Sequence, residues 1–298
     1  MKRTVQDIGE DALVRRLVAK APMGEEVVAG PGDDCAVVKG TQRGELMLLK
    51  TDAIVEGVHF EPDSPAKLVG RKALARVLSD VAAMGGRPGQ ALVTLILPPD
   101  TPLAWVDGVY SGMYELARRH GVSMVGGETT RGVQRLLSVT LTGTVKAGKW
   151  SARGGGKKGD VLLVTGRLGG SLGGRHFRFE PRLEQGHWLV EHFPIHAMMD
   201  ISDGLAKDLP RMAAGAGLGF RVEMERLPRH RGCSVAAAWG DGEDYELLLA
   251  VPPRSMKKLM TEWKKCFPAL PLTAIGQLVD KCDSMDGPDG GWDPFVKA

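Results

Sequence analysis

Short apolar runs and longer amphipathic stretches alternate along this chain, and the alternation is the feature that most restricts its fold. The apolar runs at Leu46–Leu49 and Ala91–Leu97 predict buried strands. Apolar residues at helical spacing predict a helix over 66–84 and a second helix with Pro102 at its first position and Gly121 at its end. Elements that alternate in this way predict an α/β protein.

A segment rich in glycine and lysine, residues 146–160, interrupts this alternation. The pattern then resumes, with a helix after Asp203 and another at 255–266. A length of 298 residues fits two domains of ordinary size. We therefore predict an α/β fold of the α+β type with two mixed-sheet domains, 1–148 and 149–298.

The composition excludes several classes of protein. Lysine and arginine number 39 against 36 acidic residues, a net charge of +3 that argues against a dedicated nucleic-acid binder. The sequence has no apolar run of the roughly 18 residues that a membrane span needs, and its charged N-terminus does not resemble a signal peptide. The 4 cysteines include no C-x-x-C pair and fit free thiols in a reducing compartment. We expect a soluble cytoplasmic protein.

Acidic residues recur in turns beside glycine, serine or threonine, most of them at the predicted ends of strands. Asp80 differs, because it lies on a predicted helix next to the apolar Val77 and Val81. Mg²⁺ binds carboxylate oxygens and is commonly shared with substrate phosphates. The acids together predict a site for metal-bound phosphates, although each one alone could cap a helix or stabilise a turn. They are Asp33, Asp52, Asp80, Glu128, Asp200 and Asp203.

Seven segments of the chain resemble the thiamine-monophosphate kinases, a family within the superfamily of aminoimidazole ribonucleotide synthetase. The segments are GPGDDCAVV (30–38), TDAIVEGVHF (51–60), KALARVLSDVAAMG (72–85), GVSMVGGETTRG (121–132), MDISDGLAKDL (199–209), GEDYELLLAVPP (242–253) and GGWDPF (290–295). They follow the family order over nearly the whole chain. The resemblance implies phosphorylation of thiamine monophosphate by ATP, several Mg²⁺ ions, and a homodimer whose N-terminal domains pair.

The resemblance also implies roles for individual residues, carried over by position. It implies metal ligands at Asp33, Thr51, Asp52, Asp80, Asp200 and Asp203, with Glu128 in place of a family aspartate. Among these, it makes Asp33, Asp52, Asp80 and Asp203 catalytic. It implies contacts with ATP at Tyr110, Gly127, Glu128, Arg153 and Ser202, and contacts with the thiamine substrate at His59, Glu243 and Trp292.

Without the resemblance, several of these residues have simpler interpretations. Tyr110 lies on the apolar stripe of its helix and could be a core residue with no functional role. His59 could be a hydrogen-bonded turn histidine, and Trp292 a loose aromatic near the chain end. Arg153 could be a solvated charge in a linker.

Three positions depart from the family pattern. Glu128 keeps the charge of the family aspartate, but its extra methylene moves the oxygens by roughly 1.5 Å. Lys50 stands where the family often has serine or threonine, so its ammonium either neutralises part of the acidic cluster or points the other way from the strand. Pro210 predicts an early end or a kink in the helix after Asp203.

The predicted chemistry needs no general base. A phosphate monoester has a second pKa of about 6 and already carries a nucleophilic oxyanion at neutral pH. The obstacle is repulsion between two anions, which metal ions held by acidic residues remove. Two alternatives stay open at this point: another ATP-dependent synthetase or ligase of the superfamily, and a non-catalytic nucleotide-binding protein.

Overall fold

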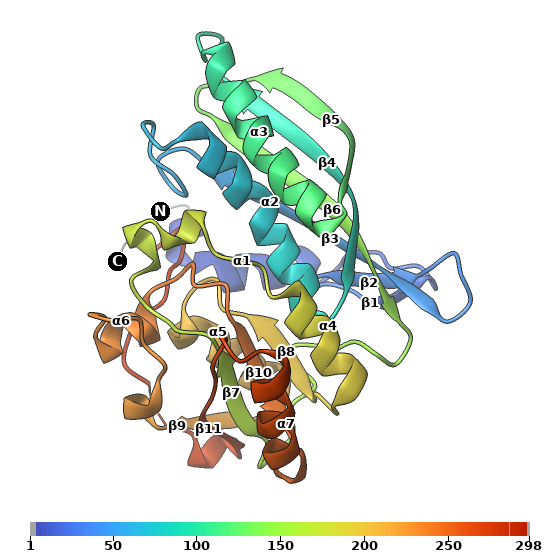
Figure 1. The fold of residues 1–298 in the computed structure, drawn as a ribbon, viewed down its shortest axis with the longest axis vertical. Helices are drawn as coiled ribbons and strands as arrows, with labels where there is room; N and C mark the ends of the chain where they lie inside the picture. Colours follow the sequence, from blue (N-terminus) through green and yellow to red (C-terminus); the bar gives the residue numbers. More distant parts are fainter. Residues whose placement is uncertain (1–3, 286, 297–298) are drawn as a thin grey trace.

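The computed structural model describes residues 4–285 and 287–296 and contains two sheets, with α2 (Ala66–Ala83) between them (Figure 1). The first sheet has six strands in the order β1-β2-β3-β6-β4-β5. Strands β4 and β5 pair in parallel and its other neighbouring strands pair antiparallel, so the sheet is mixed, as predicted. The strands are β1 (Val27–Ala29), β2 (Ala36–Lys39), β3 (Glu45–Val55), β4 (Arg87–Leu97), β5 (Ser123–Arg131) and β6 (Leu136–Lys146).

Two long helices, α2 and α3 (Leu103–His120), cover one face of this sheet (Figure 1). Glycines let them cross closely: a Cβ at Gly70 would lie 1.9 Å from the Val109 carbonyl oxygen. Gly121 ends α3 in the left-handed conformation, as predicted, with φ +68°. Pro102 precedes the first helical residue instead of occupying that position, a difference of one residue. The described residues form no helix on the opposite face of the sheet, and Leu92 is exposed there.

The second sheet has five strands in the order β8-β10-β7-β11-β9. All of its pairings are antiparallel, so the prediction of a mixed sheet in this half is wrong. Apolar side chains line both faces of the sheet, because helices cover both. The strands are β7 (Val161–Thr165), β8 (Ala197–Asp200), β9 (Gly219–Val222), β10 (Leu247–Val251) and β11 (Leu272–Val279).

The helices of this half are α5 (Leu205–Gly215) and α6 (Val235–Gly240) on one face, and α4 (Leu183–His192) and α7 (Pro253–Cys266) on the other. Helix α5 continues through Pro210, so the predicted early end does not occur. Short 3₁₀ turns lie at Val5–Asp7, Ser171–Gly173, Arg175–Phe177, Met224–Arg226 and Lys281–Asp283. Among the described residues, no helix combines the length and apolar character that crossing a membrane requires.

Helix α2 joins the two halves. A Cβ at Gly186 of α4 would lie 2.0 Å from the Ala82 carbonyl oxygen, so α4 lies directly against the end of α2. The same end of α2 contacts β8. The N-terminal helix α1 (Gly9–Val18) lies beside α5, where Arg211 forms an ion pair of 2.8 Å with Asp11. This packing brings α2, β8 and the loops around them to one place.

Candidate active site

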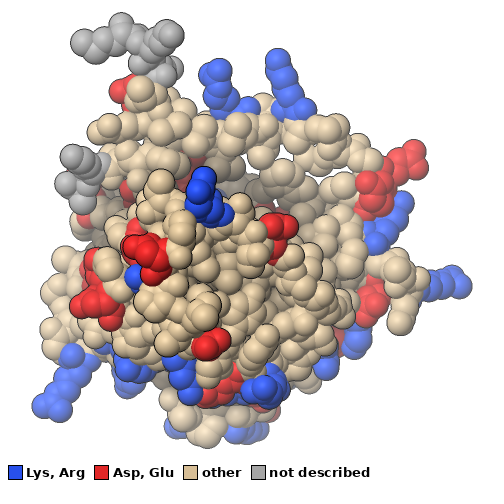
Figure 2. Space-filling view, turned by 90° about the horizontal axis from the view of Figure 1, so that it is seen from above, with Lys and Arg blue, Asp and Glu red and all other residues tan. Residues whose placement is uncertain are grey.

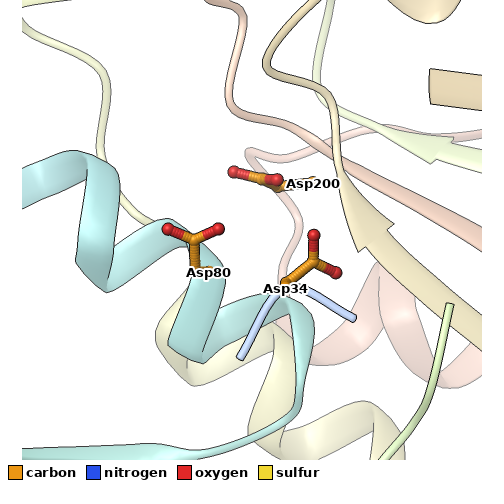
Figure 3. A group of neighbouring side chains, drawn as sticks. All are labelled: Asp34, Asp80 and Asp200. Atoms are coloured by element: carbon orange, nitrogen blue, oxygen red, sulfur yellow. The ribbon is translucent and has the colours of Figure 1, made fainter. Parts of the chain in front are cut away.

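Three buried aspartates meet where α2 approaches the end of β8, with their carboxylates turned toward one space (Figure 3). Asp34 precedes β2, Asp80 lies on α2, and Asp200 ends β8. One oxygen from each lies within 4.8 Å of the others. Ser79 Oγ donates a hydrogen bond of 2.6 Å to Asp200 Oδ2, whereas Asp34 Oδ2 is buried with no hydrogen-bond partner in the described chain.

The electrostatics of this group favour a cation. Burial raises the pKa of Asp200 to about 7, and the charge of Asp34 adds to the increase. Burial also raises the pKa of Asp80 well above its ordinary value. A bound divalent cation would stabilise the ionised carboxylates, and all-oxygen donors suit Mg²⁺. The unpartnered oxygen of Asp34 supplies a free lone pair for such an ion. The residues present therefore fit the metal that the resemblance implies.

Strand β3 places two further side chains beside this group. Because side chains alternate along a strand, Lys50 and Asp52 face α2 while Thr51 faces the other side. Lys50 Nζ lies 2.8 Å from Asp80 Oδ1, which settles its orientation toward the acidic cluster. Asp52 accepts a hydrogen bond of 2.9 Å from Arg76 Nε. Thr51 instead bonds across the outer face to Thr140, at 3.0 Å.

The backbone and side chain of Arg153 hold the acidic loop before β2. Its amide donates a hydrogen bond of 2.6 Å to Asp33 Oδ1, and its guanidinium pairs with Asp34 at 2.5 Å. Asp203, in the loop between β8 and α5, pairs with Arg211 at 2.5 Å. These contacts rule out the simpler interpretation of Arg153 as a solvated charge, and its contact with ATP stays a prediction.

Helix α2 carries a stripe of charged residues: Lys72, Arg76 and Asp80 are spaced by four and share one helix face. Lys72 is fully buried, with its ammonium 2.7 Å from both the His59 carbonyl oxygen and His176 Nδ1, and paired with Glu243. Sequence reasoning missed Asp34, Lys72, Arg76 and His176. For Lys72 and Arg76 the sequence did contain a signal. Both are charged residues in an otherwise apolar helix, and they precede Asp80 at intervals of four residues.

The loop after α6 presents Glu243 through an unusual backbone. Glu243 and Tyr245 both have positive φ, +65° and +53°, a conformation that costs energy and concentrates at functional sites. The Glu243 amide donates to the Ser202 carbonyl at 2.6 Å and the Tyr245 amide to Ile201 at 2.8 Å. Burial opposes ionisation of Glu243, but the hydrogen bond to His176 and the charge of Lys72 lower its pKa to about 2.

Two cavities open at this place. The larger, about 1110 Å³, is lined by Asp33, Asp34, Lys50, Asp52, Asp80, Arg153, Asp200, Ser202 and Asp203, among others. The smaller, about 410 Å³, is lined by His59, Phe60, Phe177, Glu243, Tyr245 and Trp292, among others. We call them the large cavity and the small pocket. Most of the predicted metal and ATP residues thus lie at the large cavity, and the three predicted thiamine residues lie at the small pocket.

Four predicted residues lie outside both cavities in a single chain, and their roles stay predictions. Glu128 is exposed on β5, where its own carboxylate accepts the Thr129 amide at 3.0 Å. Gly127 fits tightly against β4, because a Cβ there would lie 1.8 Å from the Val93 carbonyl oxygen. Tyr110 packs beside a second tyrosine of α3, and Thr51 faces the outer side of the sheet.

Family comparisons match this architecture. Residues 32–145 match the N-terminal domain of AIR synthase related proteins, and residues 175–284 match the C-terminal domain. The fold and the site therefore place the chain in this class. Within it, the chain belongs to the thiamine-monophosphate kinase family. It is 37% identical to the thiamine-monophosphate kinase of Rhodopirellula baltica over 86% of this chain and 85% of that protein. The corresponding Escherichia coli protein is 33% identical, over 93% and 92%.

Solved structures agree with this assignment. The structure of AaThiL complexed with AMPPCP and TMP has a TM-score of 0.84 and 27% identity, and the match covers 99% of each chain. Thiamine-monophosphate kinase from Stenotrophomonas maltophilia has a TM-score of 0.73 and 30% identity, over 90% of this chain and 93% of that one. The chain therefore shares its two-domain fold with these kinases.

Proposed function

We propose that this protein transfers the γ-phosphoryl group of ATP to the phosphate of thiamine monophosphate, giving thiamine diphosphate and ADP. The observation that carries the proposal is the adjacency of the two cavities. The large cavity has the buried aspartates, and the small pocket beside it has aromatic walls and the half-buried carboxylate of Glu243. A relative of this fold has been solved with an ATP analogue and TMP together.

The reaction joins two anions, so the site must lower their repulsion. An oxygen of the acceptor phosphate forms a bond to the γ-phosphorus while the bond from that phosphorus to the β,γ-bridging oxygen breaks, and ADP leaves. Mg²⁺ bound by Asp34, Asp80 and Asp200 would neutralise charge on the phosphates. Lys50, Arg76 and Arg153 are among the cationic side chains that line the large cavity and add positive charge there.

The small pocket suits the organic part of the acceptor. Thiamine contains a thiazolium cation and a flat aminopyrimidine, and the Trp292 ring at the pocket wall can cover either. That ring stands edge-on to His59, with centroids 5.5 Å apart. Burial and the charge of Arg76 lower the pKa of His59 to about 4, so the ring is neutral at pH 7 and does not repel a cation. Glu243 adds a carboxylate that can accept from an amino group.

The deciding experiment is a product assay with purified protein, ATP, Mg²⁺ and thiamine monophosphate. We expect stoichiometric thiamine diphosphate and ADP, and loss of turnover with EDTA. Parallel reactions with thiamine and with aminoimidazole-type acceptors serve as controls. Turnover with one of those acceptors but not with thiamine monophosphate would contradict the proposal, as would ATP binding without product.

A homodimer and a cytoplasmic location belong to the same proposal. The outer face of the six-stranded sheet exposes Leu49, Leu92 and Val125, and a second copy of the chain would cover it. Thr51 and Glu128 lie on that face, so in a dimer they would lie at the interface, where the two copies can form a site together. Light scattering should give a dimer that Leu92→Lys dissociates, while Leu103→Lys, at an exposed leucine of α3, leaves it intact. The free thiols fit a reducing compartment.

A further inference from the structure

The large cavity and the small pocket share part of their lining. Six residues face both spaces: His59, Arg76, Ser202, Asp203, Tyr245 and Trp292. A ligand that extends from one cavity into the other must pass these side chains. If the rings of the acceptor lie in the small pocket and its phosphate points toward the large cavity, the phosphate lies among these six side chains.

Arg76 is the cation at this junction. Among the residues that line the small pocket in the described chain, it is the only lysine or arginine. His59 is the neighbouring base, but its neutral ring offers no full charge. Asp203 already pairs with Arg211. Of the six residues that face both spaces, Arg76 is therefore the one that offers a fixed positive charge to a dianionic phosphate at the junction.

The Arg76 guanidinium has a hydrogen-bond donor that no group of the described chain accepts. Its Nε donates to Asp52 at 2.9 Å, and Nη1 lies 3.8 Å from Glu243 Oε1, beyond hydrogen-bond length. Nη1 is buried and has no hydrogen-bond partner in the described part of the chain. A buried donor without a partner is costly, and a bound ligand is one of the ways in which such a donor is satisfied. The Asp52 contact also fixes the orientation of the fork.

The position of Arg76 on α2 ties it to the reaction. It lies one helical turn before Asp80, so both side chains project from one face into the same space. A phosphate bound by Arg76 would thus lie beside the acidic cluster, where the transfer takes place.

We propose that Arg76 binds the acceptor phosphate at the junction and makes the site selective for a phosphate monoester over the free alcohol. This inference rests on the proposed function and deepens it. An arginine fork matches phosphate oxygens through paired, charge-assisted hydrogen bonds. Hydrogen bonds to charged groups contribute about 1.5–3 kcal/mol, which corresponds to roughly a 10- to 150-fold preference.

The test measures binding, not turnover. Isothermal titration in EDTA, without ATP, gives dissociation constants for thiamine monophosphate and for thiamine. With no metal present, only protein groups recognise the phosphate. The wild-type protein should bind the monophosphate about 10- to 150-fold more tightly. Arg76→Met should reduce this preference to about threefold or less with little change for thiamine, and Arg76→Lys should keep an intermediate preference.

Arg15→Met is the matched control, because it removes an exposed cation of α1 that lines only the large cavity. It should keep most of the preference. If Arg76→Met retains the full preference, or if Arg15→Met abolishes it equally, the assignment to Arg76 is overturned while the kinase activity stands. If the wild-type protein binds neither compound and makes no product, the proposed function falls as well. Circular dichroism of each variant, with Arg76→Lys as the conservative one, separates lost binding from lost folding.

Discussion

The ammonium of Lys50 lies 2.8 Å from Asp80 Oδ1, inside the group of acids that fits a divalent cation. Burial opposes the charged form of Lys50, but Asp80 and Asp52 raise its pKa above the ordinary value, so the ammonium stays charged. A cation that is part of the chain thus occupies one side of the cluster. On the face shown in Figure 2, basic and acidic side chains are interspersed.

Lys50→Thr should let the cluster bind metal more strongly. Without the ammonium, Asp80 has an uncompensated charge, and we expect Mn²⁺ affinity to rise about tenfold or an additional ion to bind. The metal-free variant should also lose about 3 kcal/mol in free energy of unfolding, because one member of a buried pair has been removed. Mn²⁺ titration followed by electron paramagnetic resonance gives number and affinity. Lys67→Met, at an exposed ion pair, is the control, and unchanged Mn²⁺ binding in Lys50→Thr would contradict the prediction.

Asp80→Asn should leave the protein folded and reduce kcat by about 100-fold or more. Asparagine keeps the shape of the side chain but removes the charge that attracts Mg²⁺. Steady-state kinetics at saturating Mg²⁺ and a thermal melt test the two parts separately. Asp63→Asn, at an exposed aspartate, should change neither. Near-native kcat in Asp80→Asn would remove Asp80 from the metal site.

Trp292→Ala should raise KM for thiamine monophosphate roughly 2- to 30-fold, the equivalent of a desolvated ring contact of about 0.5–2 kcal/mol. KM for ATP should barely change, because the ring contacts His59 at the small pocket, whereas the predicted ATP residues Arg153 and Ser202 line the large cavity. The ring is well placed for this role: the Trp292 amide donates to Asp203 at 2.9 Å and its carbonyl accepts from Lys207 at 2.8 Å. Phe295→Ala is the control for a general effect of changing the C-terminal segment. An equal rise of both KM values in Trp292→Ala would indicate a folding defect.

His59 should make the protein less stable in mild acid. Its Nδ1 accepts the Val55 amide at 3.1 Å, so that nitrogen carries no proton in the folded state. Burial first, and then the charge of Arg76, lower the pKa from 6.5 to about 4. Between these values the unfolded chain binds more protons than the folded one, so stability rises with pH through this window and falls as pH drops toward 4.

Urea denaturation at pH 4.5 and 7 measures this effect. His59→Gln should flatten the difference by about 1–2 kcal/mol, an amount already discounted for the partial exposure of the ring. His192→Gln, at an exposed histidine, should leave the pH profile as it is. A profile unchanged in His59→Gln would show that other groups cause the acid sensitivity.

The sequence by itself determined the elements and the chemistry. Periodicity predicted a helix over 66–84, and α2 spans Ala66–Ala83, because a long buried helix leaves a regular apolar pattern. Gly121 marked the end of α3 for a local steric reason. The motifs likewise indicated which residue types gather at the site. Such features depend on neighbours within a few positions, which a sequence displays directly.

Only the tertiary structure decided which side chains meet. Asp34, not its neighbour Asp33, joins Asp80 and Asp200 in the tight cluster, because the loop before β2 turns one carboxylate inward. The sequence pattern also did not predict that the strands of the second sheet are antiparallel, or that Lys50 points toward the acidic cluster. The contact that assembles the site, from Ser79 to Asp200, joins residues 121 positions apart. Such a contact depends on how α2 packs against β8, and no local spacing in the chain encodes that packing.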